Sequence, residues 1–287
     1  FRSEMVASDE ILKRTSDQYR RIRNTFRFIL GNLSDFSDKN KVKFEDQVEL
    51  DKWIINETNT LQKEIISLYE SYSYHKAIQK VHNFCVNELG GIYLDIVKDR
   101  LYTCKNESLA RRSCQTSLDF ILNVLVRLIA PILSYTAEEI WQTSNRLNSQ
   151  GDSVFLSNFD TSQINYESNI NQSEWKRIFE IKDAVNQSIE AMRNENKIKG
   201  SLDSVVDIQT TSNDLNILKK LGEELHFLFI SSEANVNEAK SFKIKVNSSK
   251  NTKCVRCWHR CSSVGSSKEH PELCNSCLLY TSPSPRD

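Results

Sequence analysis

Four of the eight cysteines occur in two closely spaced pairs near the end of this 287-residue chain. Cys254 and Cys257 form one C-x2-C pair, and Cys274 and Cys277 form a second pair after sixteen intervening residues. Each pair brings two thiolates to one side of a turn, and two such turns supply four soft ligands for a tetrahedral zinc ion. Because four thiolates leave no position open for water, the spacing predicts one structural, non-catalytic zinc ion per chain.

Other interpretations of these cysteines stay open at this stage. His259, Cys261 and His270 lie between the two pairs and could replace one of the four ligands. Unligated thiols or disulfides are the other alternative. The first nine residues show no basic segment followed by an apolar one, so we expect a cytoplasmic protein, in which disulfides are disfavoured. The remaining cysteines lack paired spacing and are expected to be inert thiols in helices: Cys85, Cys104 and Cys114.

The residues around the first cysteine pair suggest a recognition surface. Arg256 and Trp258 flank Cys257, and Arg260 and Lys268 follow. An exposed Trp among basic residues can stack an unpaired base while the cations hold phosphate. The alternative is that Trp258 covers the metal or packs on a neighbouring strand.

A second basic cluster lies near the beginning of the chain and comprises Arg20, Arg21, Arg23, Asn24 and Arg27. Net charge is zero, but residues 1–27 carry seven Lys/Arg against four Asp/Glu (+3), and residues 240–287 carry nine against three (+6). Phosphate contacts depend on clustered charge, so a neutral chain with basic ends can bind RNA locally. The alternative is a solvated helix face.

The elements that carry these residues are mainly α-helical. Seven Gly and four Pro in so long a chain favour long helices. A stripe from Leu12 to Leu33 predicts a first helix that ends near Gly31 and Asn32. Further helices are expected over 45–69, over 74–97 with an interruption at Gly90-Gly91, over 108–130, from Thr136 with a capping box to Glu139, and over 174–196.

Strand patterns appear only after residue 200. Residues 205–210 and 242–246 read as strands, with an amphipathic helix over 214–230 between them. We therefore expect a helical bundle at 1–148, a linker, helix and small α+β module at 149–250, and a zinc module at 251–277. Residues 278–287 read as a non-native tail.

Motifs for independent catalysis are missing from this sequence. It contains no G-x-x-x-x-G-K-[ST] loop, no G-x-G-x-x-G turn and no H-E-x-x-H pair, and its five His are scattered. No apolar run approaches the roughly 18–20 residues that cross a bilayer, so we expect no membrane partner. We predict no catalytic residue in this chain.

Several segments in the same order resemble bacterial isoleucyl-tRNA synthetases. They are Ser8–Arg14, Tyr19–Phe28, Tyr93–Arg100, Ala110–Thr116, Ala130–Trp141, and the Cys254–His259 string followed by Glu269, His270 and the second cysteine pair. The Tyr-Arg-Arg-Ile-Arg-Asn-Thr and Cys-Val-Arg-Cys-Trp-His strings are specific in combination. The resemblance covers roughly residues 4–277.

The resemblance implies a class I synthetase anticodon-binding domain followed by the family's zinc end. The family joins isoleucine to its tRNA with ATP, and its ATP, Mg²⁺ and editing sites lie upstream of the segments matched here. It implies that Arg21, Arg23, Arg256 and Trp258 contact tRNA. We expect an isoleucine-tRNA partner, no DNA, a monomer, and no activity from this chain alone.

Two other readings remain open. One is the equivalent region of a valyl- or leucyl-tRNA synthetase, which shares the helical domain, although a four-cysteine end favours isoleucine. The other is a non-enzymatic zinc-ribbon adaptor that binds RNA or protein. The sequence does not indicate the source organism, the binding affinity, or any anticodon-loop modification that binding requires.

Overall fold

Two compact units make up the computed structural model, which describes residues 8–159 and 167–278. The first unit comprises residues 1–95 and 112–166, and the second comprises residues 96–111 and 167–287. No helix of the described residues is both long enough and apolar enough to cross a membrane. The residues read as a non-native tail lie, apart from Leu278, outside the described part of the chain.

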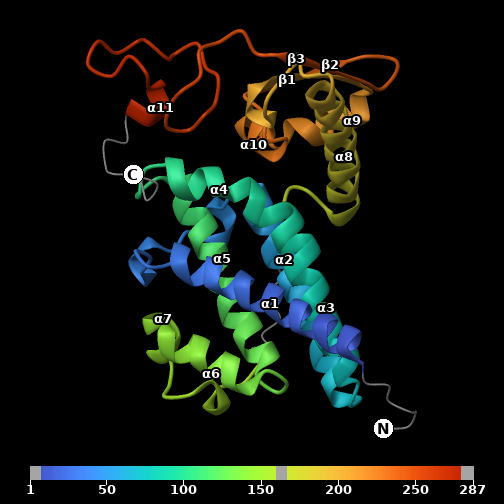
Figure 1. The fold of residues 1–287 in the computed structure, drawn as a ribbon, viewed down its shortest axis with the longest axis vertical. Helices are drawn as coiled ribbons and strands as arrows, with labels where there is room; N and C mark the ends of the chain where they lie inside the picture. Colours follow the sequence, from blue (N-terminus) through green and yellow to red (C-terminus); the bar gives the residue numbers. More distant parts are fainter. Residues whose placement is uncertain (1–7, 160–166, 279–287) are drawn as a thin grey trace. The chain divides into compact units, whose positions relative to one another are not determined.

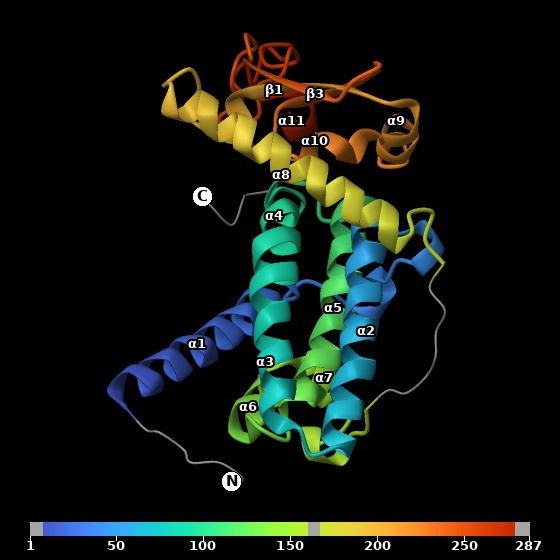
Figure 2. The same ribbon diagram turned by 90° about the vertical axis from the view of Figure 1, so that its right-hand side faces the viewer.

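The first unit is a bundle of helices (Figure 1). Figure 2 shows α2, α3 and α5 running side by side, with α1 crossing them. Apolar residues at helical spacing bury one stripe of α1 at Ile22, Phe26 and Ile29, as the sequence predicts. The helices of this unit are α1 (Asp9–Asn32), α2 (Glu49–Glu70), α3 (Tyr74–Phe84), the beginning of α4 (Leu94–Thr103), most of α5 (Leu109–Ile129), α6 (Ser134–Thr143) and α7 (Asn145–Asn148).

The predicted interruption at Gly90-Gly91 takes the form of a π-helical segment, Cys85–Tyr93. A Cβ atom at Gly90 would lie 3.0 Å from the carbonyl oxygen of Cys85, and one at Gly91 would lie 3.3 Å from that of Val86. The wider π turn therefore brings backbone close to backbone, and glycine tolerates that approach.

The capping box predicted at Thr136 is wrong. Helix α6 begins at Ser134 with Leu133 as its N-cap, and the amide of Ala137 donates to the carbonyl of Leu133. Thr136 instead lies within the first turn of α6 and is buried, with its hydroxyl 3.0 Å from the hydroxyl of Tyr19 on α1. A capping box does occur at the start of α8, between Asn171 and Glu174.

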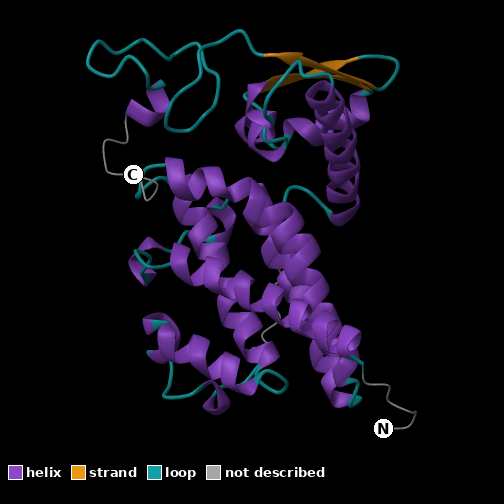
Figure 3. Ribbon diagram, in the orientation of Figure 1, coloured by secondary structure: helices purple, strands orange, loops and turns teal. Residues whose placement is uncertain are grey.

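The second unit contains a three-stranded sheet with helices on one face (Figure 3). The strand order is β2-β1-β3, with β2 parallel and β3 antiparallel to the central β1. Val206 and Ile208 of β1 are fully buried. The elements are α8 (Gln172–Asn194), β1 (Ser204–Thr210), α9 (Ser212–Lys219), α10 (Leu225–Leu228), β2 (Glu233–Glu238), β3 (Lys243–Ser248) and α11 (Asn275–Leu278).

Two details of this unit differ from the sequence-based expectation. The single helix predicted over 214–230 is wrong, because it divides into α9 and α10 around Gly222, whose φ is +53°. Strand β2 was not predicted, and its residues are mostly polar and half exposed. Such a strand lacks the strict alternation of apolar and polar residues that marks strands in a sequence.

A buried carboxylate connects three helical segments of the first unit. Asp51 on α2 is fully buried and accepts hydrogen bonds from the hydroxyls of Tyr93 (2.7 Å) and Ser113 (2.5 Å). Ser113 Oγ in turn accepts from the amide of Val48, 3.0 Å away. A buried carboxylate needs such donors because, without them, the free energy lost when it left water is not recovered.

We therefore predict that Tyr93→Phe lowers the free energy of unfolding by about 1–3 kcal/mol, because Asp51 loses a donor that water cannot replace. Urea denaturation followed by circular dichroism measures this change. Tyr135→Phe is the matched control, since Tyr135 is 95% exposed, and we expect a change within about 0.5 kcal/mol. Equal effects of the two variants would contradict the assigned role of the Asp51 network.

Candidate metal centre and RNA-binding surface

The two predicted cysteine pairs come together in the second unit. The sulfur atoms of Cys254, Cys257, Cys274 and Cys277 all lie within 4.8 Å of one another, and all four residues are buried. Cys257 Sγ lies 3.7 Å from Cys274 Sγ. Zinc–sulfur bonds of about 2.3 Å in a tetrahedron place sulfurs roughly 3.8 Å apart, so the donor set and its spacing fit a closed zinc site.

The three competing ligands do not join this group among the described residues. The His259 ring is buried, with its Nε2 3.6 Å from Asp99 Oδ2. Burial alone would lower the pKa of His259, but the neighbouring charges of Asp99, Cys257 and Cys274 raise it. Cys261 packs against the four cysteines without belonging to the group, and His270 is exposed.

The metal centre has almost no apolar core around it. Among the residues that the structure describes, the partly buried hydrophobic ones packed against the four cysteines are Cys261, Val264 and Leu273. With so little apolar surface to bury, the energy that folds residues 251–278 must come mainly from the metal.

The other cysteines of the chain are unsuited to metal binding or redox chemistry. Burial raises the pKa of Cys85 to about 12 and that of Cys104 to about 11. Cys114 is fully buried, 3.6 Å from the Tyr93 hydroxyl. Thiols held in the protonated form are poor nucleophiles and poor ligands.

Trp258 follows the second cysteine in a strained backbone conformation. Its φ is +66°, in the left-handed region that glycine adopts without cost and bulky residues rarely enter. The side chain is 52% exposed, and Lys253 Nζ lies 5.3 Å from the centre of its ring. Trp258 is therefore not a buried residue, and its half-exposed ring lies beside a cation. Arg256 lies on the same turn and is half buried.

Arg260, the residue after His259, holds this turn against the sheet, a role that its local sequence does not predict. Arg260 Nε lies 2.6 Å from the carboxylate of Asp203, which precedes β1. The sequence near Arg260 shows only a basic residue beside the cysteines. Its partner Asp203 lies 57 residues earlier in the chain, so the pairing cannot be predicted from local sequence.

The basic residues of α1 fall into two groups. Arg20 pairs with Asp17 at 2.9 Å, and Arg23 forms two hydrogen bonds of 2.6 and 2.7 Å to Glu139 of α6. The side chains of Arg21, Asn24 and Arg27 are exposed and have no polar partner among the residues that the structure describes. These last three follow one another at three-residue intervals, so they lie close together on the helix surface.

The hydrogen bonds with Glu139 raise the pKa of Arg23, and those with Arg23 lower the pKa of Glu139. Both side chains are about half exposed, so this pair contributes little to stability but occupies the Arg23 guanidinium. The unpaired residues Arg21, Asn24 and Arg27 are therefore more available to a phosphate than Arg20 and Arg23.

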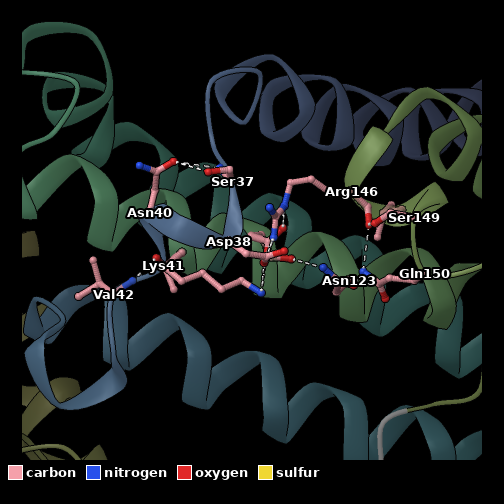
Figure 4. Close-up of polar contacts among 12 residues, drawn as sticks. Ser37, Asp38, Asn40, Lys41, Val42, Asn123, Arg146, Ser149 and Gln150 are labelled. Atoms are coloured by element: carbon pink, nitrogen blue, oxygen red, sulfur yellow. Dashed lines mark hydrogen bonds and ion pairs between the residues drawn. The ribbon is translucent and has the colours of Figure 1, made fainter.

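A cleft of about 940 Å³ in the first unit carries a different kind of charge pattern. Figure 4 shows Lys41 and Arg146 converging on Asp38. Lys41 Nζ and Arg146 Nη2 each lie 2.9 Å from Asp38 Oδ1. Arg146 also lies 2.6 Å from the buried Asp119. Hydrogen bonds from Lys41, the larger contribution, and from Arg146 lower the pKa of Asp38 to about 2. Carboxylates therefore already neutralise these two cations. The same contacts connect the segment before α2 to α5 and α7.

Two family models match the chain. One is described as the anticodon-binding domain of tRNA ligase and matches residues 51–209, which is more than half of the chain. The other is described as a zinc finger found in FPG and IleRS and matches residues 252–278, which include all four cysteines.

Curated relatives match over nearly the whole chain. Isoleucine–tRNA ligase from Pseudoalteromonas atlantica is 43% identical over 97% of this chain and 31% of its own length. The enzymes so named from Marinomonas sp. and Legionella pneumophila are 42% and 41% identical over the same shares. The chain therefore spans about a third of the length of these relatives.

We predict that removing the metal loosens residues 251–278 selectively. Cys274→Ser should lower zinc content from one ion per chain and raise amide hydrogen exchange across this segment, while exchange in α2 and α5 stays unchanged, because the metal supplies the folding energy here. Cys104→Ser is the matched control, and we expect full zinc content. Mass spectrometry of the exchanged peptides measures the effect. Protection of residues 251–278 that is unchanged between Cys274→Ser and the parent chain would contradict a structural role for the metal.

Proposed function

The chain belongs to the family of anticodon-binding domains of tRNA ligases, and from this membership we propose that it is the tRNA-binding region of an isoleucine–tRNA ligase. The observation that carries the proposal is the pairing of this domain with a four-cysteine centre that presents a strained, half-exposed Trp258 beside Lys253. The ATP-dependent joining of isoleucine to tRNA is assigned to the part of the relatives that this chain does not span. We expect this chain alone to be inactive and monomeric.

We propose that Cys254, Cys257, Cys274 and Cys277 hold one structural Zn²⁺, which keeps the Trp258 turn in shape and supplies no chemistry to a substrate. The four thiolates would fill the coordination sphere of the ion. The residues of this chain then act by binding alone: cations hold phosphates and fix the register, while an aromatic ring takes an unpaired base.

We propose two contact regions for the RNA. On α1, Arg21, Asn24 and Arg27 take phosphate or sugar oxygens directly, whereas Arg20 and Arg23 must first exchange their carboxylate partners. On the zinc module, Trp258 stacks an anticodon base and Arg256 lies beside it on the same turn. Base-edge contacts there would separate isoleucine tRNA from tRNAs of other identity.

The zinc-ribbon adaptor is the second candidate and is the less favoured one. A general RNA-binding adaptor would bind different tRNAs equally, because phosphate contacts carry no sequence information. The first test therefore compares tRNAs of different identity.

We predict that the zinc-loaded chain binds isoleucine tRNA more tightly than valine tRNA, and that Trp258→Ala removes most of this preference. Loss of a stacked base costs about 1–3 kcal/mol. Filter binding at fixed moderate salt measures both affinities. Equal affinity of the unsubstituted chain for the two tRNAs would favour the adaptor.

Trp258→Gly separates recognition from folding in the same assay. Glycine adopts the φ of +66° without strain, so this variant should retain its zinc and match or exceed the stability of the parent chain, yet bind RNA as weakly as Trp258→Ala.

We also predict that Arg27→Ala weakens binding to both tRNAs by a similar factor and reduces the slope of log affinity against log salt by about 1, because one phosphate contact is lost. Arg193→Ala is the control, since this substitution removes one positive charge from α8, where Arg193 pairs with Glu190. An unchanged slope in Arg27→Ala would return the α1 residues to the role of a solvated helix face.

A further inference from the structure

We propose that Arg260 is a positioning residue whose ion pair with Asp203 holds Trp258 in the orientation that accepts an RNA base. The inference deepens the function proposed above and rests on it. Arg260 itself is assigned no contact with RNA.

Arg260 attaches the zinc-binding turn to the sheet at three points. Its Nε lies 2.6 Å from Asp203 Oδ1, its Nη1 donates to the carbonyl of Asn251 at 3.2 Å, and its backbone amide donates to Ser232 Oγ at 2.7 Å. These partners precede β1, follow β3 and precede β2, respectively. The side chain is thus held by two of these segments and the backbone by the third, so the residue has little freedom to reorient.

Asp203 is a fixed anchor for this attachment. Its side chain is 10% exposed, its Oδ2 accepts from the amide of Gly200 at 3.1 Å, and its carbonyl accepts from the amide of Ser249 at 2.8 Å. Burial alone would raise the pKa of Asp203, but the hydrogen bond and charge of Arg260, together with the Gly200 amide and the charge of Lys253, lower it. The carboxylate is therefore charged when it faces Arg260.

The residues on both sides of Trp258 are fixed independently. Cys257 precedes it in the four-cysteine group, and the buried His259 follows it beside Asp99. The backbone also closes the turn, since the Trp258 amide donates to Cys254 at 3.0 Å and the Cys254 amide donates to His259 at 2.9 Å. These restraints hold a bulky residue in a left-handed conformation that it would otherwise leave.

Arg260 also places the cation beside the Trp258 ring. Arg260 and Lys253 form an antiparallel β-bridge, and Lys253 Nζ lies 5.3 Å from the ring centre. The metal fixes the cysteines, whereas the Arg260 contacts decide how the turn meets the sheet and where Lys253 lies. Loss of the ion pair would therefore leave the zinc bound but the ring and its cation less ordered.

The experiment compares four variants of the zinc-loaded chain: Arg260→Ala, Asp203→Asn, Trp258→Ala and the double variant Arg260→Ala/Trp258→Ala. Affinity for an isoleucine-tRNA anticodon stem-loop is measured over a range of salt concentrations, and zinc content and circular dichroism establish that each variant is folded. Arg193→Ala is the matched control for the loss of one positive charge, because it leaves the zinc-binding turn untouched.

We expect Arg260→Ala to keep one zinc ion and to bind about tenfold more weakly, in line with the loss of one ordered stacking contact. Asp203→Asn should weaken binding as well. That result has the opposite sign from simple electrostatics, since removing a negative charge would by itself strengthen binding to RNA. The salt slope should match that of Arg193→Ala, because no phosphate contact is lost.

The double variant is the most discriminating measurement. If Arg260 acts through Trp258, Arg260→Ala should add almost nothing to the effect of Trp258→Ala, because coupled residues are not additive. Additive losses with a slope reduced by about 1 would show a direct phosphate contact and overturn the proposal. Tighter binding of Asp203→Asn would overturn it too.

Tryptophan fluorescence gives a readout that does not depend on RNA. The chain has four Trp, and Trp53, Trp141 and Trp175 are at most 6% exposed, so acrylamide quenches mainly Trp258. Quenching and loss of anisotropy should increase in Arg260→Ala and Asp203→Asn but not in Arg193→Ala. If Trp258→Ala binds RNA normally, the proposed function of Trp258 fails. If only the Arg260 and Asp203 variants behave normally, the positioning role fails.

Discussion

A carboxylate can be buried only where donors replace the water that it loses, and both units of this protein are organised around that constraint. In the first unit, the fully buried Asp51 holds Tyr93 and Ser113 together and so joins α2, the π-helical segment and α5. In the second unit, Asp203 holds Arg260 and the ends of the strands. In each case one acidic side chain connects segments that are far apart in the sequence.

The zinc module depends on such contacts because it has little apolar core. Its few packed residues bury too little apolar surface to define how the module meets the sheet. A closed four-thiolate site fixes the distances between the cysteines, but it has no preferred direction with respect to the rest of the protein. The Arg260–Asp203 ion pair and the His259–Asp99 contact supply that direction within the second unit.

Charge neutralisation separates the cations that are already paired within the protein from those that remain available to a phosphate. The cations at the cleft of the first unit, Lys41 and Arg146, converge on Asp38 and Asp119, and Arg23 on α1 is taken by Glu139. Arg21 and Arg27 carry the same charge without such partners among the described residues. A count of basic residues therefore overstates the phosphate-binding surface, and the ion pairs that each residue makes decide its role.

The sequence by itself determined the features that depend on local spacing. Two C-x2-C pairs predicted the ligand group, helical periodicity predicted α1, α2 and α5, and short specific strings indicated the family. Only the tertiary structure decided the rest. The apolar spacing over 214–230 continues through Gly222, so periodicity cannot reveal the left-handed turn that divides the helix. Thr136 has the pattern of a cap, yet it lies inside α6 because the helix already begins at Ser134. The partners of Arg23 and Arg260 lie 116 and 57 residues away, and such pairings arise from folding and leave no mark in local sequence.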